Sequence, residues 1–185
     1  MAHMADVDID TGQRDNILNL IKHTPATLKH DKKHNSGVYI QPIPINPLTK
    51  NSSLTYKDAD ERGYFKLDIL NVNIYTEIKD STHYEKLMST TPPWEKLQEK
   101  DFVEQLVQIN NQYDLLNLMK PDSIPRMAMF IAVMRPGKSY LRGRSWDEVS
   151  KTVWKKEPKA VYSYKKSHAI AYATLIALHM NIINE

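Results

Sequence analysis

The sequence predicts an α+β fold, in which a small sheet near the N-terminus is followed by a mainly helical part. Three observations support this prediction. Short apolar segments before residue 71 have the two-residue period of strands. Beyond about residue 82 the apolar residues recur at helical spacing. The composition, 41% hydrophobic and 25% charged over 185 residues, is that of one globular domain or two closely packed subdomains.

Three strands and a helix are predicted in the first part of the chain, residues 5–75. The first strand is ADVDID at 5–10, in which aspartates alternate with aliphatic residues. A helix over about 13–23 follows it. The second strand is GVYIQ at 37–41, which ends at proline-spaced residues that suit neither a helix nor a central strand. The third is YFKLDIL at 64–70, whose apolar and charged residues face opposite ways.

Helices are predicted for the remaining residues, 76–185. Apolar spacing indicates a continuous helix over 95–109. A second helix begins at an Asp or Ser cap near 122–123 and stops at the Pro-Gly pair 136–137. Ser145 and Glu148 have the spacing of a capping box at the start of a third helix. The last helix, about 167–184, is apolar on most sides and is expected in the core.

The composition excludes several classes of protein. The chain has no cysteine, which excludes disulfide frameworks, cysteine-ligated zinc and thiol nucleophiles, and a reducing, cytoplasmic setting is expected. Its most apolar run, 169–183, is too short and too polar to span a bilayer, so no membrane partner is expected. The opening MAHM resembles a cloning-tag remnant, and nothing is inferred from it.

Positive charge is concentrated in the segment 126–168. It contains eleven Lys and Arg residues against three acids, a net charge of +8, whereas the whole chain carries only +3. The same segment contains aromatic residues, among them Trp146, Trp154, Tyr162 and Tyr164. A basic surface with aromatic residues is typical of a site for a polyanion such as a nucleic acid, although a solvated lysine-rich face would give the same pattern.

The acidic stretch at 5–10 is the clearest candidate for chemistry. On a strand, Asp6 and Asp8 project to one face, and paired carboxylates of this kind can hold divalent cations for phosphoryl transfer. A calcium loop is excluded, because Gly12 and Ile17 stand where its spacing requires other residues. The alternative is a frayed acidic terminus. A clip formed by His30 and His34 is a weaker metal-site hypothesis, since a third ligand is missing.

Five short strings occur along the chain in this order: ADVDID (5–10), HNSGVYI (34–40), YFKLDIL (64–70), KPDSIPRMAMFIAVMRPG (120–137) and YKKSHAIAYA (164–173). They resemble, in the same order, the palm and fingers motifs of the bacterial family C replicative DNA polymerases, the DNA polymerase III alpha subunits. Five ordered strings that cover nearly the whole chain are far more specific than any one of them.

The resemblance implies a palm-like segment at 5–75 and a helical fingers-like segment at 76–185, acting in DNA replication. It implies catalytic aspartates that bind two Mg²⁺ ions, namely Asp6, Asp8 and Asp68. Residues near the incoming deoxynucleoside triphosphate would be Lys66, His34, Gly37, Arg135, Lys166 and His168. Contacts to primer-template DNA are expected from Arg142, Arg144, Lys155 and Lys156. The source would be a phage, with the protein in the host cytoplasm.

Three interpretations of the sequence remain open. In the first, the chain is a reduced palm-and-fingers module that performs metal-dependent nucleotidyl transfer, with a separate chain supplying the Gly-Ser-rich palm element that these residues lack. In the second, it is a non-catalytic remnant of such a polymerase that binds DNA or a replisome protein. In the third, the motif matches are chance and the chain is a small helical binding protein. Retention of all three aspartates favours the first, because a buried carboxylate cluster without a cation is costly. The lack of the Gly-Ser-rich palm element favours the second.

Overall fold

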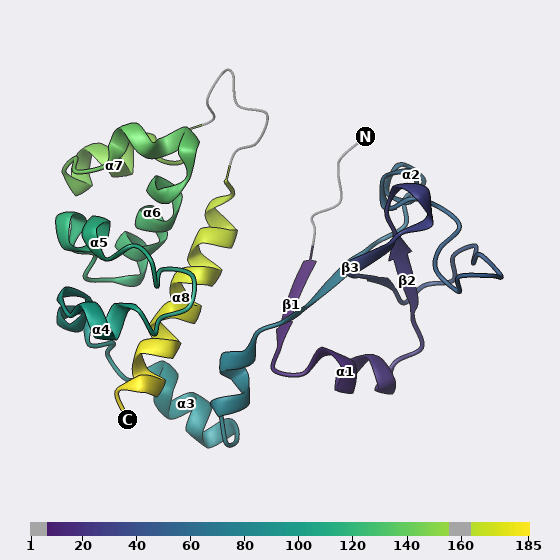
Figure 1. Ribbon diagram of the computed structural model, residues 1–185, viewed down its shortest axis with the longest axis horizontal. Coiled ribbons are helices and arrows are strands. Elements are labelled where there is room, and N and C mark those ends of the chain that lie inside the picture. The colour runs from purple at the N-terminus through teal and green to yellow at the C-terminus, as the bar shows by residue number, and fades with distance from the viewer. Residues whose placement is uncertain (1–6, 156–163) are drawn as a thin grey trace. The chain divides into compact units, whose positions relative to one another are not determined.

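The computed structural model describes residues 7–155 and 164–185, and it confirms the α+β class. The chain divides into two compact units. Residues up to Lys79 form the sheet unit, and residues from Asp80 form the helical unit (Figure 1). Each unit has apolar clusters of its own.

A four-stranded mixed sheet organises the sheet unit, with the strand order β1-β4-β3-β2. The strands are β1 (Val7–Thr11), β2 (Thr24–Thr27), β3 (Lys33–Tyr39) and β4 (Leu67–Asn71). β1 runs parallel to β4, whereas β3 is antiparallel to both β4 and β2. Two of the predicted strands are therefore displaced by a few residues, since β3 begins and ends earlier than 37–41 and β4 begins later than residue 64.

The two faces of the sheet are covered by different helices (Figure 1). On one face, α1 (Arg14–Leu20) places Leu18 against Val38 and Ile69. On the other, Tyr39 packs with Ala59 of α2 (Tyr56–Glu61). Two short 3₁₀ turns, η1 (Lys29–Asp31) and η2 (Asn73–Glu77), complete the unit. Because alternate residues of a strand face opposite ways, Asp68 lies on the face opposite to Ile69, as the sequence predicts.

Strand β2 was not predicted, because its sequence, Thr-Pro-Ala-Thr, contains a proline. Proline cannot donate to a strand ladder, so it is confined to edge strands and bulges. β2 lies at the edge of this sheet, and its register with β3 shifts between Pro25 and Thr27. The carbonyl of Pro25 still accepts a hydrogen bond from the amide of Ser52 at 2.9 Å. Edge position and bulge together explain why the proline is tolerated here.

The helical unit is built around one large apolar cluster. Its elements in chain order are α3 (Ser81–Ser89), η3 (Trp94–Gln98), α4 (Lys100–Val103), α5 (Tyr113–Met119), α6 (Ile124–Met134), η4 (Pro136–Leu141), α7 (Trp146–Thr152) and α8 (Lys166–Ile183). Met127, Phe130 and Ile131 of α6 are buried together with Ile176 and Met180 of α8. The unit is thus centred on the pair α6 and α8 (Figure 1).

The prediction of one continuous helix over 95–109 is wrong. The backbone is extended at Glu99, which separates η3 from α4, and Gln108 has a left-handed φ of 68°. The amide of Val107 donates to His179 Nδ1 at 3.1 Å instead of to a helical carbonyl. The apolar residues Leu97, Phe102, Leu106 and Ile109 are nevertheless all buried. The apolar spacing therefore predicted the buried residues correctly, but these residues lie in short turns and not in one helix.

The other helix predictions of this part are confirmed. The hydroxyl of Ser145 accepts from the amide of Glu148, and the carboxylate of Glu148 accepts from the amide of Ser145, which is a complete capping box. α6 ends at Met134, just before Pro136. α8 spans 18 residues, within one residue of the prediction at each end.

The end of α8 is fastened to α3. Asn181 donates two hydrogen bonds, to the carbonyls of Leu87 and Thr90, and Glu185 pairs with His83 and Lys86. Within residues 7–155 and 164–185, no helix is both long enough and apolar enough to cross a membrane.

Candidate functional site

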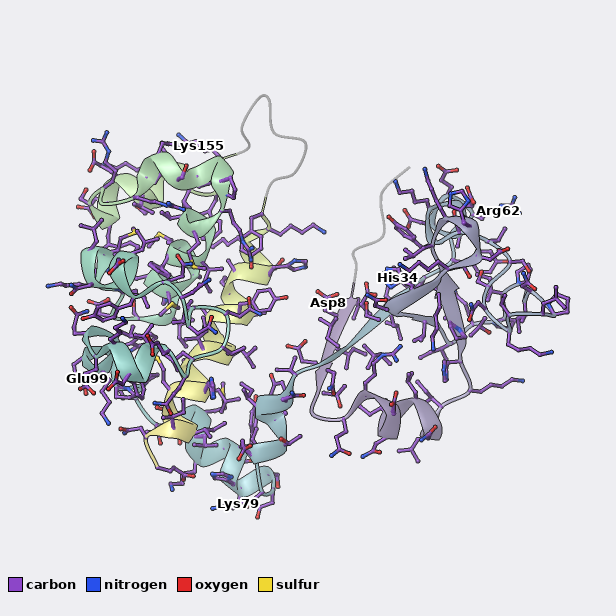
Figure 2. All side chains as sticks on the ribbon, in the orientation of Figure 1. Asp8, His34, Arg62, Lys79, Glu99 and Lys155 are labelled. Carbon is purple, nitrogen blue, oxygen red and sulfur yellow. The ribbon has the colours of Figure 1, made fainter. Side chains whose placement is uncertain are left out.

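Two of the predicted catalytic aspartates meet on adjacent strands of the sheet. The parallel register of β1 and β4 pairs Asp8 with Asp68, and the antiparallel register of β3 pairs Gly37 with the same Asp68. Paired residues of neighbouring strands, about 4.8 Å apart, project to the same face. Figure 2 labels Asp8 on β1 and His34 on β3. The third predicted aspartate, Asp6, lies outside the described residues.

Asp10 lies on the same face as Asp8, two residues along β1. Burial raises the pKa of Asp10, and the neighbouring charge of Asp8 raises it further. Repulsion between carboxylates is the condition under which a bound cation stabilises a site most. This edge of the sheet is therefore acidic, with its negative charges held close together by the strand geometry.

The carboxylate of Asp68 has a partner at each oxygen. Lys66 forms an ion pair with Oδ2, and the hydroxyl of Ser36 donates to Oδ1 at 2.8 Å. The Lys66 and Asp68 side chains are only 14% and 13% exposed, so this pair is largely withdrawn from water. Lys66 immediately precedes β4 and Asp68 is its second residue, a spacing of two that places both on one face of the extended chain. The structure thus brings the predicted cation and the predicted metal ligand into direct contact.

His34 is held as a neutral ring with a defined tautomer. Its Nδ1 accepts hydrogen bonds from the amides of Gly37, at 3.0 Å, and Ser36, at 3.3 Å. A nitrogen that accepts carries no proton, so the proton of the ring is on Nε2. Burial lowers the pKa of His34, and Lys66 lowers it further, against a smaller opposing effect of Asp68. The 3.8 Å approach of Nδ1 to Asp68 Oδ1 is therefore a contact between two acceptors and not an ion pair.

Gly37 leaves space for the lysine that crosses it. A Cβ at this position would lie 2.8 Å from Cδ of Lys66, 3.1 Å from Nδ1 of His34 and 3.2 Å from Cβ of Ala26. The first of these distances is shorter than real carbon contacts allow. Glycine at position 37 thus lets the stem of Lys66 pass over the strand and reach Asp68.

Sequence reasoning missed two side chains of this site. Ser36 lies inside the string HNSGVYI, so its position beside Gly37 could have shown it. Arg14 had no such signal, because it belongs to a short helix with no motif. Its guanidinium donates to the carbonyls of Ile69, at 3.0 Å, and Ser36, at 3.4 Å, and so links α1 to the middle of β4 and of β3.

The predicted nucleotide-binding residues after position 126 belong to the helical unit. Arg135 follows the last residue of α6, and its guanidinium lies 4.7 Å from the ring centre of Tyr164, a cation–π contact. Lys166 is the first residue of α8, and His168 is half-buried in its first turn. Arg135 thus lies near the start of α8, because Tyr164 precedes Lys166 by two residues.

The predicted DNA-binding residues surround η4 and α7. Arg142 donates to the carbonyl of Met134 at 3.1 Å, so it caps α6, and Arg144 lies 3.9 Å from Glu148. Lys155 is exposed just after α7 (Figure 2). Lys156 lies outside the described residues. Exposed cations are therefore present here, but Arg142 also has a structural role.

The donor chemistry of the sheet site fits Mg²⁺, which takes carboxylate oxygens and retains several waters. In the part of the chain that the structure describes, no group of three or more His, Asp or Glu side chains is arranged to hold a metal ion. Asp8 and Asp68 supply two carboxylates on one face, and a third would come from Asp6. Whether these residues bind metal stays a prediction.

The comparisons with known proteins add nothing to this geometry. No protein-family model, no curated protein and no solved structure matches the chain. The case for a function therefore depends on the site itself and on the sequence motifs that form it.

Proposed function

We propose that this chain is a palm-and-fingers module similar to that of family C DNA polymerases, which performs metal-dependent nucleotidyl transfer in DNA replication, with a separate chain supplying the remaining palm part. Its substrates would be primer-template DNA and deoxynucleoside triphosphates. In this reaction the primer 3′ hydroxyl attacks the α-phosphorus of the nucleotide, and pyrophosphate leaves.

One observation carries the proposal, which is the register of the sheet. Asp8 and Asp68 are 60 residues apart in sequence, yet β1 and β4 pair them directly. Three other residues singled out by the same motifs, Lys66, His34 and Gly37, lie beside Asp68. Chance matches in a helical protein would have no reason to converge on one carboxylate. This convergence favours a functional site over the acidic-tail alternative.

Each residue of the site has a role that its chemistry allows. Asp8 and Asp68, with Asp6, would hold Mg²⁺, which when bound offsets the negative charge that develops on phosphoryl oxygens. Lys66 carries a positive charge that suits a triphosphate. His34 presents an Nε2–H donor, because its Nδ1 is used by the backbone. Ser36 and Gly37 fix the positions of Asp68 and of the Lys66 stem.

Metal and nucleotide binding to aspartate variants tests the proposal. Asp8→Asn and Asp68→Asn should each abolish Mn²⁺ binding measured by calorimetry, and should abolish the metal- and nucleotide-dependent tightening on a labelled primer-template. Asp15→Asn is the matched control, because that side chain is 90% exposed on α1. Circular dichroism verifies that the variants fold. Unchanged Mn²⁺ affinity in both active-site variants would refute the proposal.

A second candidate is a non-catalytic DNA-binding remnant of such a polymerase. Two observations favour it: Lys66 already neutralises Asp68, and the segment 126–168 is strongly basic. It predicts that Arg144→Glu combined with Lys155→Glu weakens DNA binding and flattens its salt dependence, while the aspartate variants bind normally. Arg142 is left unchanged in this test, since it caps α6.

A further inference from the structure

A pocket of about 390 Å³ opens between three helices of the helical unit. It is lined by Ile124, Pro125, Ala128 and Met129 at the start of α6, Ser150 of α7, Trp154 just after α7, and Lys166 and Ile170 of α8. Pockets of this size suit small organic groups. All of its lining residues belong to one compact unit, so the pocket is a feature of that unit alone.

The lining combines an apolar surface with one positive charge. Most of it is apolar, with the indole of Trp154 as its largest aromatic surface, and Lys166 is the single charged residue. A ligand that matches it needs a flat apolar part to contact the indole and an anionic group to meet the ammonium. An unpaired nucleotide has both, since every base has a π-face and is joined to a phosphate.

We propose that this pocket takes one unpaired base of single-stranded DNA, which stacks on Trp154 while an adjacent backbone phosphate contacts Lys166. The choice of template DNA as the source of that strand rests on the proposed function. Pocket and aspartates are on different units, so binding here does not require a metal at Asp8 and Asp68.

The basic character of the segment that supplies part of the lining favours nucleic acid over an apolar peptide. The segment that supplies Ser150, Trp154 and Lys166 is the basic one, with a net charge of +8 between 126 and 168. Such a surface attracts a polyanion and repels a basic peptide, whereas an uncharged apolar peptide gains no electrostatic attraction to it. Base stacking on an aromatic side chain tolerates any base, which is what a template strand of changing sequence requires.

The test uses the fluorescence of Trp154 in the full chain. Trp94→Phe and Trp146→Phe leave Trp154 as the single tryptophan. Titration with an oligodeoxythymidine should quench its emission, and the same oligonucleotide with abasic sites should not. By anisotropy, Trp154→Ala should weaken binding of the base-bearing strand about tenfold and leave abasic binding unchanged.

Controls separate stacking from loss of structure. Trp154→Phe should retain most of the affinity, because a phenyl ring still stacks. Trp146→Ala is the matched control, since Trp146 is the first residue of α7 but contacts Arg126 and does not line the pocket. Lys166→Gln should weaken binding and reduce the slope of log K against log salt by about one.

Two outcomes would overturn the proposal. One is equal binding of abasic and base-bearing strands with no quenching. The other is quenching by a short acidic, apolar peptide but not by DNA. The Asp8→Asn variant keeps this test independent of the proposed function, because base-dependent binding should persist in it even where metal binding is lost.

Discussion

Replacing Lys66 with methionine tests how the sheet site is stabilised. Methionine keeps an unbranched apolar stem but removes the charge that pairs with Asp68. The remaining partner of that carboxylate is the Ser36 hydroxyl. Because both members of the ion pair are about six-sevenths withdrawn from water, the loss should exceed that of a surface pair. We expect a free-energy cost of about 1.5–3 kcal/mol, the range for a hydrogen bond to a charged group.

Hydrogen exchange of β3 and β4 is the suitable assay. All three tryptophans belong to the helical unit, so their emission does not report on the sheet. The expected cost corresponds to about ten- to hundredfold faster exchange of the β4 amides. Lys57→Met on the exposed side of α2 is the matched control and should leave exchange unchanged.

Addition of Mn²⁺ tests whether Asp68 can bind a metal ion as well as pair with Lys66. A cation at Asp68 must displace Lys66 in the native protein, whereas in Lys66→Met it meets no competitor. The variant should therefore bind Mn²⁺ about tenfold more tightly than the native chain, and Mn²⁺ should restore much of the lost protection. Unchanged β4 exchange, or Mn²⁺ affinity equal to the native value, would refute this reasoning.

Three further changes have definite expected outcomes. Gly37→Ala should force Lys66 aside and cost about 1–3 kcal/mol in sheet stability, measured by exchange, whereas Gly137→Ala, with open space around it, should cost little. Ser145→Ala should lower the stability of the helical unit by about 1 kcal/mol, measured by tryptophan emission in urea, and no shift in midpoint would contradict the capping box. Hydrogen bonds from Lys86 and His83 lower the pKa of Glu185 from 4.5 to about 2, so its attachment to α3 should be complete above pH 4.5 and lost as the pH falls towards 2. Glu185→Gln should remove that pH dependence from α3 exchange.

The sequence predicted a helix most accurately where its apolar periodicity and its capping residues indicated the same boundaries. α6, α7 and α8 have strong apolar patterns with local stop or start signals, and all three were predicted within a few residues. The pairing of Asp8 with Asp68 could not be read from either strand alone. It follows from a parallel register that a sequence pattern does not specify.

The misses have identifiable physical causes. Residues 95–109 keep the apolar spacing of a helix, but an imidazole of α8 takes the amide of Val107, and the chain turns instead. β2 was not predicted because it contains Pro25. Proline is tolerated in an edge strand, and the edge position of β2 is known only from the assembled sheet. Arg14 contacts β3 and β4 through hydrogen bonds to residues distant in sequence, and no local motif predicts such contacts.

The parallel pairing of β1 with β4 also has a consequence for the order of events in folding. β2, β3 and β4 can form an antiparallel core without β1, whereas β1 must close a loop of 60 residues to reach its partner. β1 is also mostly exposed and lies at the edge of the sheet. We therefore expect β1 to dock last and to detach first, which pulse-labelling exchange of its amides would show. Asp8 would then reach Asp68 only at the final step, so that this carboxylate pair exists in the finished molecule and in no earlier intermediate.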